Sequence, residues 1–135
     1  MSTDSFFGEV IHAYTRQQAI ADGVLVDVTK VAREAGFSIP VAMTHSVYED
    51  CVAWTEADND RKGTLQDEAG RLWDCVWMAF VAARRGRGED RATVTVHRVP
   101  RHGRGLTPRP VSFIMAIGPG DNAEPVITLM FPEDD

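Results

Sequence analysis

Short elements with clear start and stop signals alternate through the first half of the chain. Thr15 is followed three residues later by Gln18, the arrangement of a capping box, in which two side chains satisfy free N–H groups at a helix start. The β-branched residues of 24–28 predict a brief strand or extended segment. Residues 56–63 are polar, and we expect a loop there. Apolar spacing and capping residues predict three helices in this half, over 13–23, 29–36 and 41–58.

The longest helical pattern runs from Thr64, a capping residue, to Gly86, a typical helix stop. Acidic residues lie in its first turns and arginines in its last, as the helix dipole favours. At about 100° per residue the apolar positions share one broad face; they are Leu65, Ala69, Leu72, Trp73, Val76, Trp77, Phe80 and Ala83. We therefore expect the two tryptophans and Phe80 to lie in the core. Arg71 and Asp74 fall on the opposite face, toward solvent or another helix.

The period of the pattern changes in the last third of the chain. Residues 91–99 alternate apolar and polar positions, which predicts a strand with one buried face. Two more continuous apolar runs, at 110–118 and 125–132, are typical of inner strands, and the turn residues GPGDNAE connect them. The expected fold class is α+β. N-terminal helices would pack on one face of a small C-terminal antiparallel meander, to which 24–28 can add a short strand.

The 135 residues fit a single domain, 1–135, with a frayed start at 1–8. The net charge is −6, but it is unevenly distributed. Residues 84–109, here called the basic belt, carry eight arginines and two acidic residues, whereas 110–135 carry five acidic residues and no lysine or arginine. Two interpretations stay open: the belt pairs with the protein's own acidic surface, or it orients a charged partner.

The basic belt supplies the candidate partner-binding residues, which are Arg84, Arg85, Arg87, Arg98, Arg101, Arg104 and Arg109. It contains no lysine, no interleaved aromatic residue and no nucleic-acid-binding motif. The excess of acidic residues in the whole chain also opposes tight binding to phosphates. We therefore expect no direct nucleic-acid binding and favour an acidic protein surface, which arginine can bind through paired hydrogen bonds.

Known catalytic and metal-binding patterns are missing from the sequence. There is no nucleophile elbow, no CxxC or HExxH spacing and no phosphate-binding loop, so we assign no catalytic residue, metal or cofactor. Cys51 and Cys75 lie on predicted helices and are expected to be buried, structural thiols. The polar opening of the chain and the lack of a long apolar run predict a cytoplasmic protein without a membrane span.

Three stretches, YTRQQAIADGVLVDVTKVAREAGF (14–37), QDEAGRLWD (66–74) and GPGDNAEPVITLM (118–130), resemble a family of small, uncharacterised bacterial proteins. Members are found on plasmids and other mobile elements, and the family is catalogued as a domain of unknown function. The resemblance implies a bacterial, cytoplasmic, single-domain accessory factor of mobile DNA, and it supplies no activity. Polar residues, mostly within these stretches, form a cluster to inspect: Tyr14, Arg16, Asp27, Arg71, Asp74 and Asp121.

Charge segregation without catalytic motifs favours a non-catalytic, acidic binding protein that acts on a macromolecular partner, most plausibly another protein. The resemblance suggests an accessory or anti-defence factor of a mobile element. Two alternatives stay open. One is a small enzyme whose active site is assembled from the dispersed polar cluster. The other is a self-associating protein, such as a homodimer formed through surplus apolar surface on the helix at 64–86.

Overall fold

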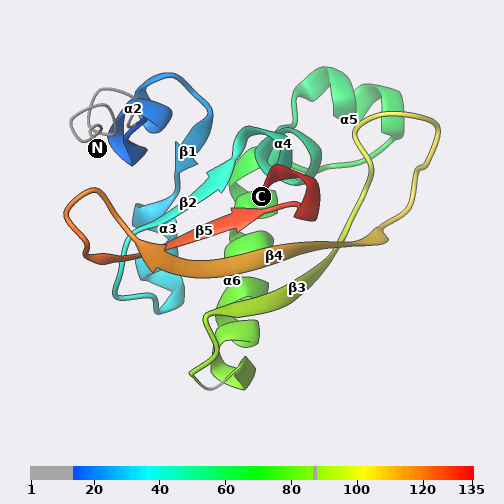
Figure 1. The fold of residues 1–135 in the computed structure, drawn as a ribbon. Helices are drawn as coiled ribbons and strands as arrows, with labels where there is room; N and C mark the ends of the chain where they lie inside the picture. Colours follow the sequence, from blue (N-terminus) through cyan, green and yellow to red (C-terminus); the bar gives the residue numbers. More distant parts are fainter. Residues whose placement is uncertain (1–13, 87) are drawn as a thin grey trace.

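The structure is a computed structural model that describes residues 14–86 and 88–135. Five strands form one mixed sheet in the order β1-β2-β5-β4-β3 (Figure 1). The parallel pair is β2 with β5, and the other neighbours are antiparallel. The strands are β1 (Leu25–Asp27), β2 (Val41–Thr44), β3 (Arg91–Arg98), β4 (Arg109–Pro119) and β5 (Pro125–Met130). The predicted α+β class and the three C-terminal strands are therefore confirmed, whereas the frayed start at 1–8 lies outside the described residues.

The helices are short except for the one that crosses the sheet. They are α2 (Arg16–Ala21), α3 (Thr29–Ala35), α4 (His45–Val47), the π-helical turn η1 (Tyr48–Val52), α5 (Glu56–Lys62), α6 (Glu68–Gly86) and the 3-10 turn η2 (Pro132–Asp134). The capping box at the start of α2 forms as expected, since Thr15 and Gln18 each accept a hydrogen bond from the other's backbone N–H. No helix in the described part of the chain is both long and apolar enough to cross a membrane.

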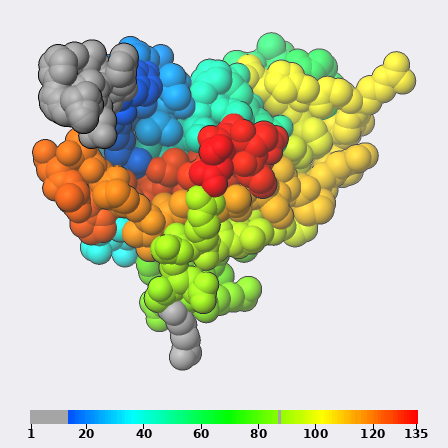
Figure 2. Space-filling view, in the orientation of Figure 1, coloured from blue at the N-terminus to red at the C-terminus, as the bar shows by residue number. Residues whose placement is uncertain are grey.

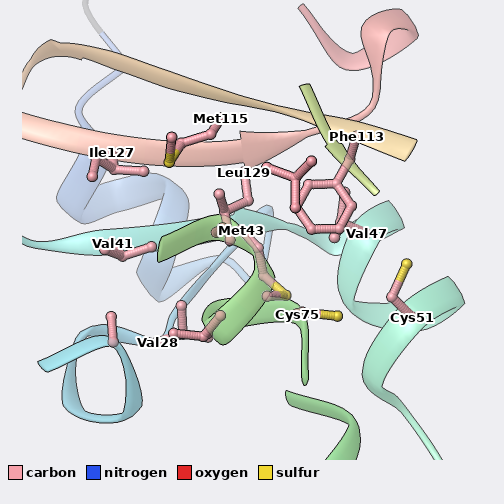
Figure 3. Packing of buried hydrophobic residues seen from close by; sticks show 14 of the residues in the cluster. Val28, Val41, Met43, Val47, Cys51, Cys75, Phe113, Met115, Ile127 and Leu129 are labelled. Carbon is pink, nitrogen blue, oxygen red and sulfur yellow. The ribbon is translucent and has the colours of Figure 1, made fainter. Parts of the chain in front are cut away.

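The hydrophobic core lies between the sheet and the helices α3 and α6. Figure 3 shows Met43, Phe113 and Leu129 of the sheet pointing toward Cys75 of α6, and all four are at most 1% exposed. The helix α2 lies against the other face, because the Arg16 guanidinium reaches the Thr128 hydroxyl, whose neighbours along β5 point into the core. The prediction that the N-terminal helices share one face is therefore wrong for α2.

The predicted helix over 41–58 is the main error in the expected topology. Residues Val41–Thr44 form β2, the parallel neighbour of β5, so the sheet is not a simple antiparallel meander. Val41, Ala42 and Met43 are each at most 1% exposed, which means that this strand is buried on both faces. The predicted loop at 56–63 is instead the helix α5, which begins with a capping box between Thr55 and Asp58.

The helix α6 is rotated relative to the orientation that its large apolar residues predict. Its buried face carries Arg71, Cys75, Val76 and Ala79, whereas Trp73 and Trp77 are 37% and 43% exposed. Small side chains allow a helix to approach a sheet closely, and an indole in the same place would hold the two apart. The prediction that the tryptophans lie in the core is therefore wrong. Of the two alternatives for Arg71, solvent or another helix, solvent is wrong, since Arg71 donates to backbone oxygens of η1.

Candidate functional site

The outward side of α6 carries a row of stacked rings, which we call the aromatic surface: Trp73, Trp77 and Phe80. The ring centroids of Trp73 and Trp77 are 5.9 Å apart with an interplanar angle of 13°, and those of Trp77 and Phe80 are 5.8 Å apart with an angle of 28°. The Arg84 guanidinium lies 5.8 Å from the Phe80 centroid. Stacking fixes the rings in place although solvent reaches both indoles.

Phe80 anchors this row to the body of the protein. Its ring packs edge-on against Phe37 at a centroid distance of 5.5 Å. The contact depends on Gly36, which ends α3 with a φ of 126°, because a Cβ at Gly36 would lie 2.6 Å from the Phe80 ring. Gly36 therefore ends the helix that the sequence predicts over 29–36, and its lack of a side chain makes room for the Phe80 ring.

The guanidinium of Arg71 is buried and joins several elements. It donates to the backbone oxygens of Val52 (3.2 Å), Asp50 (3.3 Å) and Val99 (3.0 Å), and to the side chain of Gln66 (2.8 Å). It also lies 4.4 Å from the centroid of the Trp54 ring, which is 4% exposed. Burial lowers the pKa of Arg71. Its position is that of a structural clamp between η1, α6 and the segment after β3.

The basic belt divides into paired and unpaired arginines. Arg98 contacts Asp50 at 2.9 Å, and Arg101 contacts Asp58 at 2.9 Å and Glu49 at 3.5 Å. Burial alone would raise the pKa of Asp58, but hydrogen bonds from Arg61, Thr55 and Arg101 lower it well below its usual range. The first interpretation of the belt, pairing with the protein's own acidic surface, therefore describes Arg98 and Arg101.

The loop after β3 is held by α5. Lys62 is buried and donates to the backbone oxygens of Gly103 (3.0 Å) and Gly105 (2.6 Å). Figure 2 shows this loop, in yellow, packed beside the green atoms of α5. Sequence reasoning missed the contact because α5 was expected to be a loop. The capping residues Thr55 and Asp58 were the signal that could have revealed the helix.

Four predicted partner-binding residues are exposed and form no ion pair with any other described residue: Arg84, Arg85, Arg104 and Arg109. Arg84 and Arg85 lie in the last turn of α6, and Arg84 is the one next to the aromatic surface. The region from α6 to β3 projects from the body of the molecule in Figure 2. Arg87 lies outside the described residues. The first interpretation does not account for the arginines at the end of α6, and orientation of a partner by them stays a prediction.

Three members of the polar cluster meet at a cavity of about 320 Å³, which is lined in part by Arg16, Asp27 and Asp121. The Arg16 guanidinium donates to Thr128 Oγ1 and to the Ile127 backbone oxygen, both at 2.7 Å. Asp121 accepts from the first backbone N–H groups of α2 at 2.7 and 3.0 Å. These hydrogen bonds hold α2 on the sheet, and burial lowers the pKa of Arg16.

The other members of the polar cluster lie elsewhere. Tyr14 donates to Asp22 at 2.6 Å, Arg71 is the buried clamp, and Asp74 is exposed on α6. The hydrogen-bond partners of Arg71 and Arg16 do not overlap. The six residues therefore do not form one site.

The two cysteines are free and 1% exposed, as expected for structural thiols. A hydrogen bond with Cys51, followed by burial, raises the pKa of Cys75, which opposes formation of a nucleophilic thiolate. Within residues 14–86 and 88–135, no three histidine, cysteine, aspartate or glutamate side chains are arranged to hold a metal ion.

The fold and its exposed side chains define a small α+β protein with an aromatic surface next to arginines that form no ion pair within residues 14–86 and 88–135. The chain belongs to a family of unknown function, DUF6573, whose model matches residues 3–135. No curated protein and no solved structure matches it.

Proposed function

We propose that this protein is a non-catalytic binding protein that engages another protein through the outward side of α6. The observation that carries the proposal is the pair of stacked tryptophans, 37% and 43% exposed. Tryptophan and arginine are enriched among the residues that contribute most to binding energy, and large exposed apolar patches mark contact sites. Arg84, next to Phe80 at the end of the helix, adds hydrogen-bond donors for an acidic partner.

The charges around the aromatic surface favour a protein over a nucleic acid. Exposed indoles can stack on bases, but Asp74 is exposed between Trp73 and Trp77 in the sequence, and Asp67 is exposed just before α6 begins. Both carboxylates would repel phosphates that approach the rings. In keeping with the family resemblance, the proposed partner is part of a host defence or nucleic-acid-processing complex, and the protein would be an accessory or anti-defence factor of a mobile element.

A capture experiment tests the proposal. The wild-type protein, the Trp73→Ala/Trp77→Ala variant and the control Leu106→Ala are immobilised and exposed to bacterial lysate. Leu106 is 58% exposed on the loop after β3, so its loss removes apolar surface elsewhere. A specific partner should bind to the wild type and the control and be lost from the double variant. Equal capture by all three would contradict the proposal.

Self-association is the second candidate, supported by the charge layout of α6. An exposed acid lies just before it (Asp67) and another in its first half (Asp74), and Arg84 and Arg85 lie at its end. Two copies packed antiparallel through the aromatic surface would bring acids of one copy toward arginines of the other. Light scattering over a concentration series tests this candidate. A dimer that becomes monomeric in Trp73→Ala/Trp77→Ala supports it, and a wild-type monomer at every concentration excludes it.

A further inference from the structure

The strand β3 is an open edge of the sheet. In the described chain it pairs with β4 and with no other strand. The Ile117 N–H of β4 donates to the backbone oxygen of Asp90, the residue before β3, at 2.8 Å. Because every second residue of an antiparallel strand bonds to its partner strand, this contact identifies the residues of β3 that bond to β4. By that alternation, the backbone groups of Ala92, Val94 and Val96 point to β4. Those of Arg91, Thr93, Thr95 and His97 point outward, where a further strand could bind them.

This edge lacks the features that usually block strand addition. Natural edge strands are protected by proline, by lysine, by bulges or by being short. β3 runs for eight residues in continuous register with β4, and its sequence RATVTVHR contains neither proline nor lysine. Its threonines and valines also favour extended backbone.

A groove runs along β3 where the strand lies across the second half of α6 (Figure 1). Its volume is about 370 Å³, and its lining includes Met78, Val81, Ala82 and Arg85 of α6 and Ala92 and Thr93 of β3. Side chains of an added strand alternate between two faces, so every second one would enter this groove. The groove therefore combines outward backbone donors and acceptors with an apolar wall that ends at a guanidinium.

We propose that this groove binds an extended segment of a partner protein, which adds to β3 as a sixth strand and carries a carboxylate that pairs with Arg85. Strand addition of this kind draws affinity from backbone hydrogen bonds and specificity from pockets for alternate side chains. Arg85 is exposed and forms no ion pair with a described residue. Arg91, at the same end of the groove, already holds a carboxylate, that of Asp135, at 2.8 Å.

Charge also argues against a second copy of this chain as the occupant. Only residues whose backbone groups point outward can bond across the new edge, so two antiparallel β3 strands would place Arg91 of one copy opposite His97 of the other. The strand RATVTVHR itself contains no acidic residue that could supply a carboxylate. An acidic segment of a different protein does supply one.

This site is separate from the aromatic surface of the proposed function. Met78 and Arg85 lie on the flank of α6 that faces β3, whereas Phe80 lies on the flank that contacts Phe37 of α3. The two proposals can therefore fail independently.

Phage-displayed random linear peptides, long enough to span β3, provide the probe. Selection on the wild-type protein should enrich peptides that alternate apolar residues and carry aspartate or glutamate. The best peptide is then synthesised in three forms: unmodified, and N-methylated on one or on the other set of alternate amides. N-methylation of the set that faces β3 should abolish binding, because it removes the donors of a strand ladder. Binding that survives N-methylation in both alternations, or selection of no peptide, would overturn the proposal.

Variants of the protein locate the site. Arg85→Glu should weaken the peptide about tenfold, while the matched reversal Arg104→Glu, on an exposed arginine outside the groove, should leave the affinity unchanged. Thr93→Pro removes an outward N–H that β4 does not use, and it should abolish binding. If Thr93→Pro does not fold, the peptide affinities of Arg85→Glu and Arg104→Glu are compared, and this comparison alone tests whether the peptide binds in the groove. Equal affinity for these two variants would contradict the proposal.

The variant Trp73→Ala/Trp77→Ala separates the two proposals. It should bind the selected peptide as the wild type does, even though it loses the partner captured through the aromatic surface. If it loses the peptide as well, the peptide site is the aromatic surface and the β3 groove is not involved.

Discussion

Two regions of this protein reverse the usual placement of side chains. In one, the charged groups of Arg71 and Asp58 are buried at 5% and 4% exposure, and in the other two tryptophans are 37% and 43% exposed. Both regions meet on α6, where Arg71 and Trp73 are two residues apart. Buried charges are tolerated when each polar atom has a partner, and exposed indoles cost little folding energy. The buried charges therefore hold the fold together, whereas the exposed tryptophans are available for contact with a partner.

The largest effect is expected from Arg71→Met. Removing the guanidinium would leave the backbone oxygens of Val52, Asp50 and Val99 and the Gln66 side chain without their donor. A buried acceptor left without its donor costs about 1–3 kcal/mol, so the loss of all four should total about 3–5 kcal/mol, which urea unfolding monitored by tryptophan fluorescence measures. Arg85→Met, on the exposed end of the same helix, is the control and should cost less than about 0.5 kcal/mol. A similar small cost for Arg71→Met would show that the clamp contributes nothing to stability.

The aromatic surface is anchored to the body of the protein at Gly36, which lies under the ring of Phe80. Gly36→Ala should cost about 2 kcal/mol, because alanine is strained at positive φ and its Cβ would clash with the ring. Thermal unfolding of Gly36→Ala, Phe80→Ala and the double variant separates the two causes. The double variant should be more stable than the sum of the single effects predicts. Strict additivity would mean that strain alone sets the cost.

The C-terminal strands were predictable because the pattern of apolar and polar residues in them matches the way in which they are buried. The strand β3 is buried on one face, so its residues alternate as a half-buried strand should, and turn residues mark the hairpin before β5. The strand β2 gave no such signal. It is buried on both faces, so Val41, Ala42 and Met43 form a continuous apolar run that periodicity cannot distinguish from a helix.

The orientation of α6 was not predictable from hydrophobicity alone. The pattern ranks Trp73 and Trp77 above Cys75 and Ala79 as core residues, but shape decides which face fits against a sheet. The depth of Arg71 depends on backbone oxygens from η1 and from the segment after β3, which are distant in sequence. The candidate arginines at the end of α6 were identified from composition, whereas the pairing of Arg98 and Arg101 required the fold.

Acid should weaken the buried charges and leave the aromatic surface unaffected. The folded-state pKa of Asp58 lies below its unfolded value, so its ionised form contributes stability at neutral pH, and that stability is lost as pH falls below about 4. Asp58→Asn should remove about 1–2 kcal/mol at pH 7 and clearly less at about pH 2, since the contribution is lost only as pH falls toward the lowered folded-state pKa. Denaturant unfolding across this range measures the difference. An equal loss at both pH values would show that the carboxylate charge is not what holds Arg61 and Arg101.

The smallest effect on stability is expected from Trp77→Ala. Its ring is 43% exposed and contacts mainly Trp73 and Phe80, so truncation should cost less than about 1 kcal/mol. Trp54→Ala provides the matched comparison, because that indole is 4% exposed, donates to Asn59 at 2.8 Å and lies against Arg71. Its loss should cost about 3–5 kcal/mol. Equal costs for the two tryptophans would place Trp77 in the core after all, and the case for a contact surface on α6 would then lose its main observation.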